Sequence, residues 1–312
     1  MSNIEISVVI PVYGCPAALR PLHERLTKVL NDLTKDYEII LVNDGCPKGS
    51  WQIIEEICKE DKKVKGVNLS RNFGQLHSTN AGMALSKGKY VVLMDCDLQD
   101  KPESIYDLYK EIKKGYDFVL SRRKGRKDSR LTLWFSQMFY KVYNYFSEGT
   151  NFDKDIGNLS ISTRRVVDEY NKIADRNKSF VPMLIWMGYR SSVIDLEAEE
   201  RFEGHSSYTF SKKIDMAIDL LTSNSIKPLK LVMKSGMVIA LIGFIYLLVQ
   251  VVRYFVRGDL SEGWTSIIAS IFLIGGIILI CLGGVGIYLG NIFDQTKGVP
   301  EYLIDTILND EK

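Results

Sequence analysis

The stretch YVVLMDCDLQDKP, residues 90–102, joins an apolar run to a cluster of carboxylates. Its apolar part is short and rich in Val and Leu, which predicts a buried β-strand that ends at Asp95. Carboxylates that directly follow a buried strand are costly unless they meet a cation or hydrogen-bond donors. In an extended segment Asp95 and Asp97 point to the same side, so together they can hold one divalent metal ion. Acidic pairs also occur as ordinary turn residues, but the position after a strand favours a metal site.

Upstream of this stretch, short β-rich apolar runs alternate with amphipathic segments of helical periodicity. The predicted strands are Ile6–Val12, Tyr37–Asn43, Val64–Leu69 and Tyr90–Asp95, and the predicted helices are Ala17–Leu33, Ser50–Glu60 and Ser78–Ser86. Strands that alternate with helices in this way form an α/β domain with a mostly parallel central sheet.

Polar clusters also follow the other three predicted strands. These clusters are Pro11-Val12-Tyr13-Gly14, Asn43-Asp44-Gly45 and Ser70–Gln75. Ligands of open α/β sheets bind at the carboxyl ends of the parallel strands. The sequence therefore predicts a single ligand site at that edge of the sheet.

The composition is that of a globular protein with a sizeable core. The chain has 312 residues, 46% of them hydrophobic, and its 40 Lys and Arg nearly balance its 38 Asp and Glu. The net charge of +2 gives no reason to expect a nucleic-acid partner. The five cysteines show no metal-binding spacing, which favours free thiols in a reducing compartment. No signal-peptide pattern opens the chain, so the N-terminal domain is expected in the cytosol.

The C-terminal third changes to long apolar stretches, with no charge in residues 235–252 or 263–293. A helix that crosses a membrane needs about 20 apolar residues, which predicts a hairpin of two transmembrane helices within 231–293. The alternative is a pair of buried core helices. Lys residues outside both ends of the hairpin place its flanks in the cytosol. Gly286 and Gly290 form a GxxxG step that suits close helix packing and is compatible with a homo-oligomer.

Further segments are candidates for contact with membrane lipids. Residues 131–146 carry aromatic and aliphatic side chains at helical spacing, which predicts an interfacial helix or, alternatively, an ordinary helix packed on the sheet. Residues 206–230 form an amphipathic juxtamembrane segment. The basic run that contains Arg122 and Arg126 suits anionic headgroups or a phosphate, although such runs are often only solvated loops.

The motifs PVY, NDG, LSRNFGQ, MDCDLQDKPE and RFEGHSSY together resemble those of the inverting family-2 nucleotide-sugar glycosyltransferases. The combination is similar to the branch that transfers sugars to polyprenyl phosphate, over nearly the whole chain. This resemblance implies a cytosolic nucleotide-sugar-binding domain of GT-A type over residues 1–205, a two-helix membrane anchor and a cytosolic tail over 294–312. It also implies a multi-pass protein of the bacterial inner membrane with both termini in the cytoplasm.

The same resemblance assigns roles on the donor side. Asp95 and Asp97 would bind Mg²⁺ or Mn²⁺ together with the diphosphate. Pro11 and Tyr13 would shape the site of the nucleotide base, and Asp44 would hydrogen-bond the base. The residues expected at the nucleotide-sugar are Pro11, Tyr13, Asp44, Arg71, Asp95 and Gln99.

On the acceptor side, Asp155 matches a family position thought to act as a base or to orient the acceptor, so Asp97 and Asp155 are the expected catalytic residues. The residues expected at the acceptor phosphate are Arg122, Arg126, Arg201, Ser206 and Tyr208. Two positions depart from the family pattern. Gly14-Cys15 replaces the usual Asn-Glu, which leaves the donor base less defined. Ser207 replaces the usual Lys, whose charge the basic run could supply.

The predicted reaction is transfer of a sugar, from a UDP-hexose or a UDP-N-acetylhexosamine, to undecaprenyl phosphate with inversion, in the synthesis of cell-surface glycans. A phosphate monoester is largely ionised at neutral pH, so this reaction demands no strong general base. One alternative is a transferase that extends a lipid-linked saccharide at a hydroxyl group, for which Asp155 would be essential as a base. Another is a non-enzymatic membrane scaffold, which the intact Asp95 and Asp97 disfavour.

Overall fold

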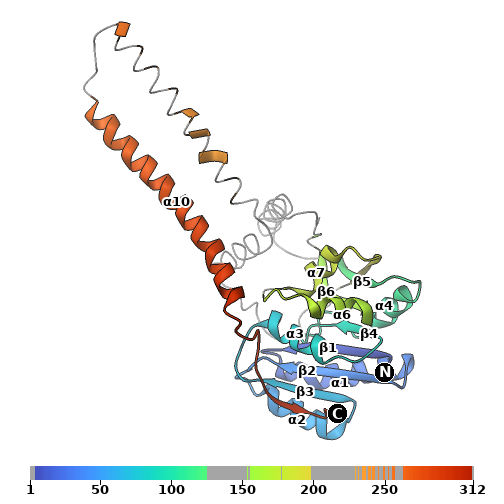
Figure 1. Cartoon of the computed structure of the whole chain (residues 1–312). Helices are drawn as coiled ribbons and strands as arrows, with labels where there is room; N and C mark the ends of the chain where they lie inside the picture. Colours follow the sequence, from blue (N-terminus) through green and yellow to red (C-terminus); the bar gives the residue numbers. More distant parts are fainter. Residues whose placement is uncertain are drawn as a thin grey trace. The chain divides into compact units, whose positions relative to one another are not determined.

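The computed structural model describes residues 4–124, 153, 155–176, 178–197 and 263–310, together with separated positions between 229 and 256 (Figure 1). Contacts divide the chain into two compact units. The first comprises Met1–Lys141, Gly149–Ser207 and Pro300–Lys312, and the second comprises Val142–Glu148 and Tyr208–Val299. The sheet and the helices that cover it belong to the first unit, and the helix α10 (Trp264–Thr296) belongs to the second.

An eight-stranded sheet forms the centre of the first unit. Its strands, in sheet order, are β7 (Ser191–Glu197), β5 (Phe118–Lys124), β6 (Ile156–Thr163), β4 (Tyr90–Leu93), β1 (Ile6–Val12), β2 (Tyr37–Asn43), β3 (Val64–Leu69) and β8 (Ile304–Leu308). The pairs β1–β2, β1–β4, β2–β3 and β5–β7 are parallel, whereas β6 runs antiparallel to β4 and β5, and β8 runs antiparallel to β3. The α/β class is therefore confirmed, but the sheet is mixed. The sequence signals located only the parallel strands, so the antiparallel ones were not predicted.

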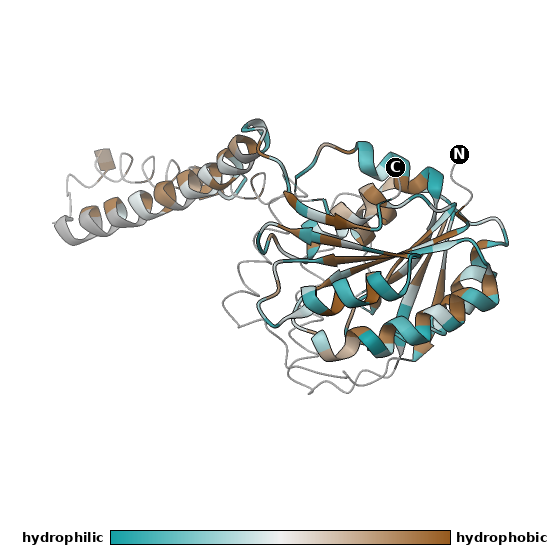
Figure 2. Ribbon diagram, turned by 90° about the horizontal axis from the view of Figure 1, so that it is seen from below, coloured by the Kyte–Doolittle hydropathy of each residue, from teal (hydrophilic) through white to brown (hydrophobic). Residues whose placement is uncertain are grey.

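Helices cover both faces of this sheet. They are α1 (Pro16–Leu33), α2 (Ser50–Glu60), α3 (Gln75–Leu85), α4 (Ser104–Ile112), α6 (Arg164–Lys172) and α7 (Phe180–Met187). Side chains alternate along each strand, so Val8 and Ile10 join the core under α1, α2 and α4, whereas Val9 joins the core under α3, α6 and α7. Figure 2 shows the apolar strands between helices whose outer faces are hydrophilic. Strands buried on both faces explain the nearly continuous apolar runs in the sequence.

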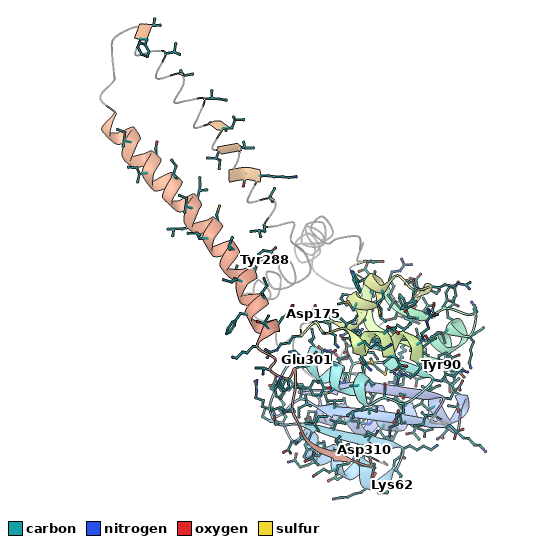
Figure 3. The ribbon with its side chains drawn as sticks, in the orientation of Figure 1. Lys62, Tyr90, Asp175, Tyr288, Glu301 and Asp310 are labelled. Atoms are coloured by element: carbon teal, nitrogen blue, oxygen red, sulfur yellow. A yellow bond between two sulfur atoms is a disulfide. The ribbon has the colours of Figure 1, made fainter. Side chains whose placement is uncertain are left out.

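The C-terminal segment, expected as a cytosolic tail, adds the edge strand β8 to the sheet. Besides pairing with β3, this segment accepts a hydrogen bond from the Ser70 N–H to the Leu303 carbonyl at 3.0 Å. The Asn309 side-chain amide donates to the carbonyls of Cys58 and Val64. Figure 3 labels Lys62 and Asp310 at this edge of the sheet. Residues 300–310 are thus an integral part of the domain that carries the candidate site.

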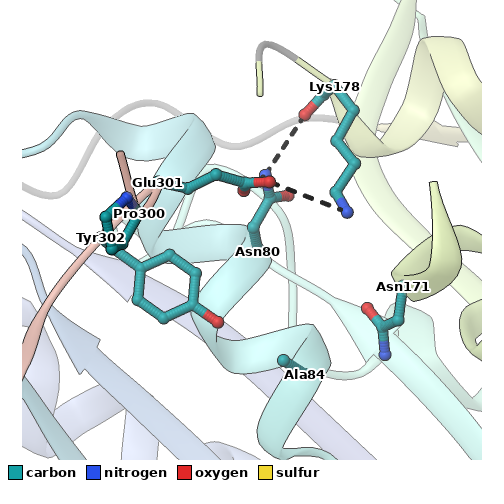
Figure 4. A pocket seen from close by; sticks show the side chains of 7 residues that line it. All are labelled: Asn80, Ala84, Asn171, Lys178, Pro300, Glu301 and Tyr302. Atoms are coloured by element: carbon teal, nitrogen blue, oxygen red, sulfur yellow. Dashed lines mark hydrogen bonds and ion pairs between the residues drawn. The ribbon is translucent and has the colours of Figure 1, made fainter. Parts of the chain in front are cut away.

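A polar cavity of about 410 Å³ lies where this segment meets α3 (Figure 4). The Asn80 amide donates to the Glu301 carboxylate at 2.9 Å, and the Lys178 ammonium lies 4.0 Å from the other oxygen of that carboxylate. The Tyr170 hydroxyl donates to Asn80 at 2.5 Å, and burial holds the pKa of Tyr170 above its usual range. This network anchors the C-terminal segment on the body of the domain.

One prediction about the C-terminal third is overturned. A membrane span requires about 20 apolar residues in one unbroken helix. Among the residues that the structure describes, no helix satisfies both the length and the apolarity that crossing a membrane requires. The prediction of a transmembrane hairpin within 231–293 is therefore wrong for the described residues, which between 229 and 256 are only separated positions. The expected interfacial helix at 131–146 and the juxtamembrane segment at 206–230 lie almost wholly outside them.

Candidate active site

The loop after β2 is built around the buried carboxylate of Asp44. One of its oxygens accepts a hydrogen bond from the Phe73 N–H at 2.8 Å, and the other accepts one from the Gly74 N–H at 2.9 Å. Burial raises the pKa of Asp44, and these two donors oppose that shift. At Gly45, which has a φ of +60°, a Cβ would lie 2.5 Å from the Asn72 nitrogen. Glycine therefore permits the loops after β2 and β3 to meet, and Asp44 holds them together.

The loop after β4 presents the carboxylate of Asp95 to a group of side chains. The amide of Gln75 donates to it at 2.7 Å, and the amide of Asn158 donates to both of its oxygens at 3.2 and 3.1 Å. The guanidinium of Arg123 lies 4.0 Å away. Burial, reinforced by the negative charge of Asp100, raises the pKa of Asp95 to about 6. This carboxylate therefore occupies a place where additional positive charge would be favourable.

A tight turn brings the second predicted metal ligand to the same edge. The carboxylate of Asp97 accepts a hydrogen bond from the Gln99 N–H at 3.2 Å. Between these residues, Leu98 is almost fully buried and has a φ of +58°. That left-handed conformation is unfavourable for a branched side chain and occurs preferentially at functional sites. Asp95 and Asp97 both lie beyond the end of β4 at Leu93, and the left-handed Leu98 directly follows them in this turn.

A bidentate ion pair supports this turn from β5. The guanidinium of Arg123 donates to the two oxygens of Asp100 at 3.1 and 2.8 Å. Burial lowers the pKa of Arg123, but its hydrogen bonds to Asp100 outweigh that effect and the net shift is upward. Asp100 is only 6% exposed, and a buried carboxylate is costly without a paired cation, which Arg123 supplies. The pair thereby orients Arg123 toward Asp95.

The structure places the other predicted donor residues at the carboxyl ends of β1 and β3. Pro11 is buried within β1, in register with Val42 of β2. Tyr13, one residue beyond β1, is 48% exposed. The guanidinium of Arg71 lies 4.2 Å from the centre of the Phe73 ring. A planar ligand the size of a nucleotide base could therefore stack on the ring of Tyr13 or on the guanidinium of Arg71 at these strand ends.

The predicted acceptor residues are only partly described. The guanidinium of Arg122 donates to Asp195 at 2.6 Å and lies 3.6 Å from Asp153. The Asp155 N–H donates to the Asp153 carboxylate, and the Asp155 carbonyl accepts a hydrogen bond from the Arg123 N–H. Asp155, the residue directly before β6, is therefore bonded to the backbone of Arg123. The predicted residues outside the described ones are Arg126, Arg201, Ser206 and Tyr208.

Two cysteines of the site are joined, in contrast to the expected free thiols. Cys15, the residue before α1, and Cys96, between the carboxylates of Asp95 and Asp97 that were predicted to bind a metal, form a disulfide with a Cα–Cα distance of 6.5 Å. Cys46, Cys58 and Cys281 are free. The pairing was missed because the partners are 81 residues apart in sequence and become neighbours only when β1 pairs with β4.

The residues at this edge fit a divalent cation that is shared with a ligand. Within the described ranges, no cluster of three or more His, Cys, Asp or Glu side chains is arranged to hold a metal. Asp95 and Asp97 supply two sets of carboxylate oxygens, and Mg²⁺ in nucleotide sites usually completes its coordination with water and phosphate oxygens. Burial, and after it the negative charges of Asp100 and Asp97, raise the pKa of Asp95, and a bound cation would favour its charged form.

Comparison with known proteins identifies the class of protein. Residues 7–170, more than half of the chain, match the model of Glycosyl transferase family 2. The chain therefore belongs to glycosyl transferase family 2, and the protein is a glycosyltransferase.

Curated relatives define the branch within this family. An uncharacterized glycosyltransferase of Bacillus subtilis, YkcC, is 32% identical, with 97% of this chain and 94% of the relative covered. The undecaprenyl-phosphate 4-deoxy-4-formamido-L-arabinose transferase of Proteus mirabilis is 33% identical, with coverage of 99% and 95%. The bactoprenol glucosyl transferase of Shigella phage SfX is 31% identical, with coverage of 96% and 99%. These relatives confirm the resemblance to the polyprenyl-phosphate sugar transferases.

Solved structures share the fold at low sequence identity. Glucosyl-3-phosphoglycerate synthase from Mycobacterium tuberculosis, in complex with Mn²⁺, UDP and phosphoglyceric acid, aligns with a TM-score of 0.51 and 14% identity over 71% of this chain and 77% of that chain. The mannosyltransferase PcManGT from Pyrobaculum calidifontis, in complex with GDP-Man and Mn²⁺, aligns with a TM-score of 0.51 and 12% identity over 72% and 64%. At this identity the likeness supports the GT-A type of fold and no finer property.

Proposed function

We propose that this glycosyltransferase moves a sugar from a nucleotide-sugar to the phosphate of a polyprenyl-phosphate lipid, with inversion at the sugar and with Mg²⁺ or Mn²⁺. The observation that carries the proposal is the carboxylate of Asp95, held with Asp97 in a strained turn at the carboxyl edge of the sheet. The names of two relatives, which refer to undecaprenyl phosphate and bactoprenol, support the choice of acceptor.

On the donor side, the reaction must release a nucleoside diphosphate. Asp95 and Asp97 would hold the cation, which when bound offsets the charge of the departing diphosphate. Arg123, fixed by Asp100 and 4.0 Å from Asp95, adds a positive charge at the same place. Tyr13, exposed after β1, would face the nucleotide base, for which uracil is the expected identity. The protein's main contributions are then positioning and charge stabilisation.

On the acceptor side, a phosphate oxygen forms the new bond to the anomeric carbon while the bond from that carbon to the diphosphate breaks on the opposite face. This single displacement inverts the configuration. The acceptor phosphate is already largely ionised at neutral pH, so Asp155 has only to orient it. Arg122 would exchange one of its carboxylate partners for the acceptor phosphate, and Arg126 of the same basic run would assist.

The chemistry of the two substrates sets the place of the reaction. A nucleotide-sugar is made in the cytosol, whereas a polyprenyl phosphate presents its headgroup at a bilayer surface. The enzyme would therefore act at the cytoplasmic surface of a bacterial membrane and supply a lipid-linked sugar for cell-surface glycans. Its basic run suits contact with anionic lipids there.

The test is transfer of radiolabelled sugar from a panel of UDP- and GDP-sugars with Mn²⁺ to undecaprenyl phosphate in detergent. We expect one donor to support transfer, and the Asp97→Ala variant to lose it. The matched control is Asp107→Ala, which removes an exposed carboxylate of α4. Transfer that survives Asp97→Ala unchanged would contradict the proposal.

The hydroxyl-acceptor alternative predicts a different response at Asp155. A sugar hydroxyl must lose its proton during attack, and loss of a general base typically costs about 10²–10⁴-fold in rate. Asp155→Asn keeps the size and polarity of the side chain but cannot act as a base. A loss of less than about tenfold favours a phosphate acceptor, and a loss within the general-base range favours a hydroxyl acceptor. A scaffold would bind nucleotide-sugar and transfer nothing to either acceptor.

A further inference from the structure

The disulfide between Cys15 and Cys96 joins two segments of the candidate site that are remote in sequence. Cys96 lies between Asp95 and Asp97, and Cys15 follows the Tyr13-Gly14 segment at the end of β1. Both cysteines are buried, with exposed fractions of 3% and 7%. The covalent bond therefore links the turn that carries the metal-binding carboxylates to the loop that carries the exposed tyrosine.

The third cysteine of the site holds the same loop from another direction. The Gly14 N–H donates to the sulfur of Cys46 at 3.2 Å, and the Ser50 hydroxyl donates to that sulfur at 3.2 Å. Burial raises the pKa of Cys46, but these hydrogen bonds outweigh it and the net shift is downward. Gly14 has a φ of +79°, so the loop turns sharply here. At this turn the loop is held by the hydrogen bond from Gly14 to Cys46 and by the disulfide of the next residue, Cys15.

The turn after β4 requires support from outside the sheet. β4 ends at Leu93, so Asp95 and Asp97 lie beyond its ladder of hydrogen bonds. Leu98 holds this turn in a conformation that branched residues avoid. A cross-link between this turn and the loop after β1 restricts their relative motion before any ligand arrives. Binding energy is then not lost in ordering the two segments.

We propose that Cys15 and Cys96 are positioning residues, whose disulfide fixes the carboxylates of Asp95 and Asp97 against the loop of Tyr13 and strengthens the binding of divalent cation and nucleotide together. The inference rests on the proposed function, since it assumes that this turn binds the cation. Reduction by a dithiol converts the disulfide to two thiols and the dithiol to its own disulfide, a transfer of two electrons. Reduced protein therefore binds both ligands more weakly.

The test measures Mn²⁺ affinity, from the electron paramagnetic resonance signal of free Mn²⁺, and UDP affinity in the presence of Mn²⁺, by calorimetry. The samples are the oxidised full-length protein, the same protein after dithiothreitol, Cys15→Ser, Cys96→Ser and the double variant. We expect roughly tenfold weaker binding of Mn²⁺ in all four altered samples, because ordering the turn becomes part of the binding reaction. The two single variants and the double variant should agree with one another, because each breaks the same bond.

Cys281→Ser is the matched control, since it removes a thiol that takes no part in the disulfide, and it should leave both affinities unchanged. Peptide mapping of the oxidised protein checks the bond itself, and circular dichroism checks the fold of each variant. If a variant does not fold, dithiothreitol treatment of the wild-type protein provides the same comparison.

Equal Mn²⁺ affinity in the oxidised and reduced protein would overturn the inference while leaving the proposed function intact. A loss confined to Cys96→Ser would also overturn it, because that result would reflect the immediate surroundings of Asp95 rather than the cross-link. Absence of the Cys15–Cys96 bond from the peptide map would do the same. If even the oxidised protein binds no Mn²⁺, the proposed function fails together with the inference.

Discussion

Asp44 and Asp95 both follow a buried strand of the same parallel set, yet their surroundings differ. The carboxylate of Asp44 accepts two backbone N–H groups of the neighbouring loop. The carboxylate of Asp95 accepts the side-chain amides of Gln75 and Asn158 and lies among other carboxylates. Backbone donors are fixed by the path of the chain, whereas side-chain donors can yield to a ligand. The carboxylate of Asp44 therefore stabilises the loops around the candidate site, whereas the carboxylate of Asp95 is placed where it could bind a ligand.

The largest expected effect separates these roles through activity. Asp95→Ala should lower the transfer rate by about 10³-fold, corresponding to about 4 kcal/mol of lost charge stabilisation. Its free energy of unfolding should change by only about 1 kcal/mol, because removal of a charge among like charges offsets the unpaired amides. Radiolabel transfer and urea unfolding measure the two quantities. A rate within tenfold of wild type would abolish the distinction between Asp95 and Asp44.

The second prediction concerns the stability of the Asp44 loop. Asp44→Ala leaves two buried backbone N–H groups without their carboxylate, which should lower the free energy of unfolding by about 3 kcal/mol. Asp44→Asn should fall between Ala and wild type, because an amide can accept hydrogen bonds through only one of the two positions. Asp36→Ala removes an exposed carboxylate before β2 and is the control. If Asp44→Ala unfolds at the same urea concentration as this control, the prediction that Asp44 stabilises the loop is wrong.

The third prediction uses pH to sharpen the same comparison. Because the pKa of Asp95 is raised to about 6, protons compete with Mn²⁺ at this carboxylate below that pH. The dissociation constant of Mn²⁺ should rise by up to about tenfold for each pH unit below 6 and stay constant above it. In the metal-free protein, the stability due to the protonated form is present below about pH 4 and is lost as the pH rises through about 6. Calorimetric titration with Mn²⁺ at pH values from about 4.5 to about 8 tests this prediction. A Mn²⁺ affinity that does not change with pH down to about pH 5 would contradict it.

The smallest expected effect comes from one donor of Asp95. Asn158→Ala removes two hydrogen bonds to the carboxylate, which leaves it less well oriented and easier to protonate. A loss of about 1 kcal/mol corresponds to about fivefold weaker Mn²⁺ binding near neutral pH. Asn171→Ala, whose amide donates to the Met83 carbonyl elsewhere in the domain, is the matched control. Equal effects of the two substitutions would assign Asn158 a general packing role.

Much of the parallel half of the domain could be predicted from local signals. Apolar runs bounded by turn residues predicted the strands from Ile6 to Leu69, and helical periodicity predicted Ser50–Glu60 with the observed bounds. The clusters after these strands predicted the edge where Asp44, Asp95 and Asp97 lie, because parallel strands align their carboxyl ends. Run length alone was a weaker signal for the segment 231–293, because no helix among its described residues is long and apolar enough to cross a membrane.

The surroundings of Asp95 were decided by the order of strands, which no local pattern contains. Asn158 and Arg123 reach that carboxylate because β6 pairs antiparallel with β4 and β5 lies next to β6. Cys15 meets Cys96 because β1 and β4 are adjacent, and β8 joins the sheet after the chain has passed through the second unit. Hydrophobic periodicity reports which side of an element is buried, not which distant element covers it. The contacts that tune a site depend on that choice of partner, so they emerge only with the complete sheet.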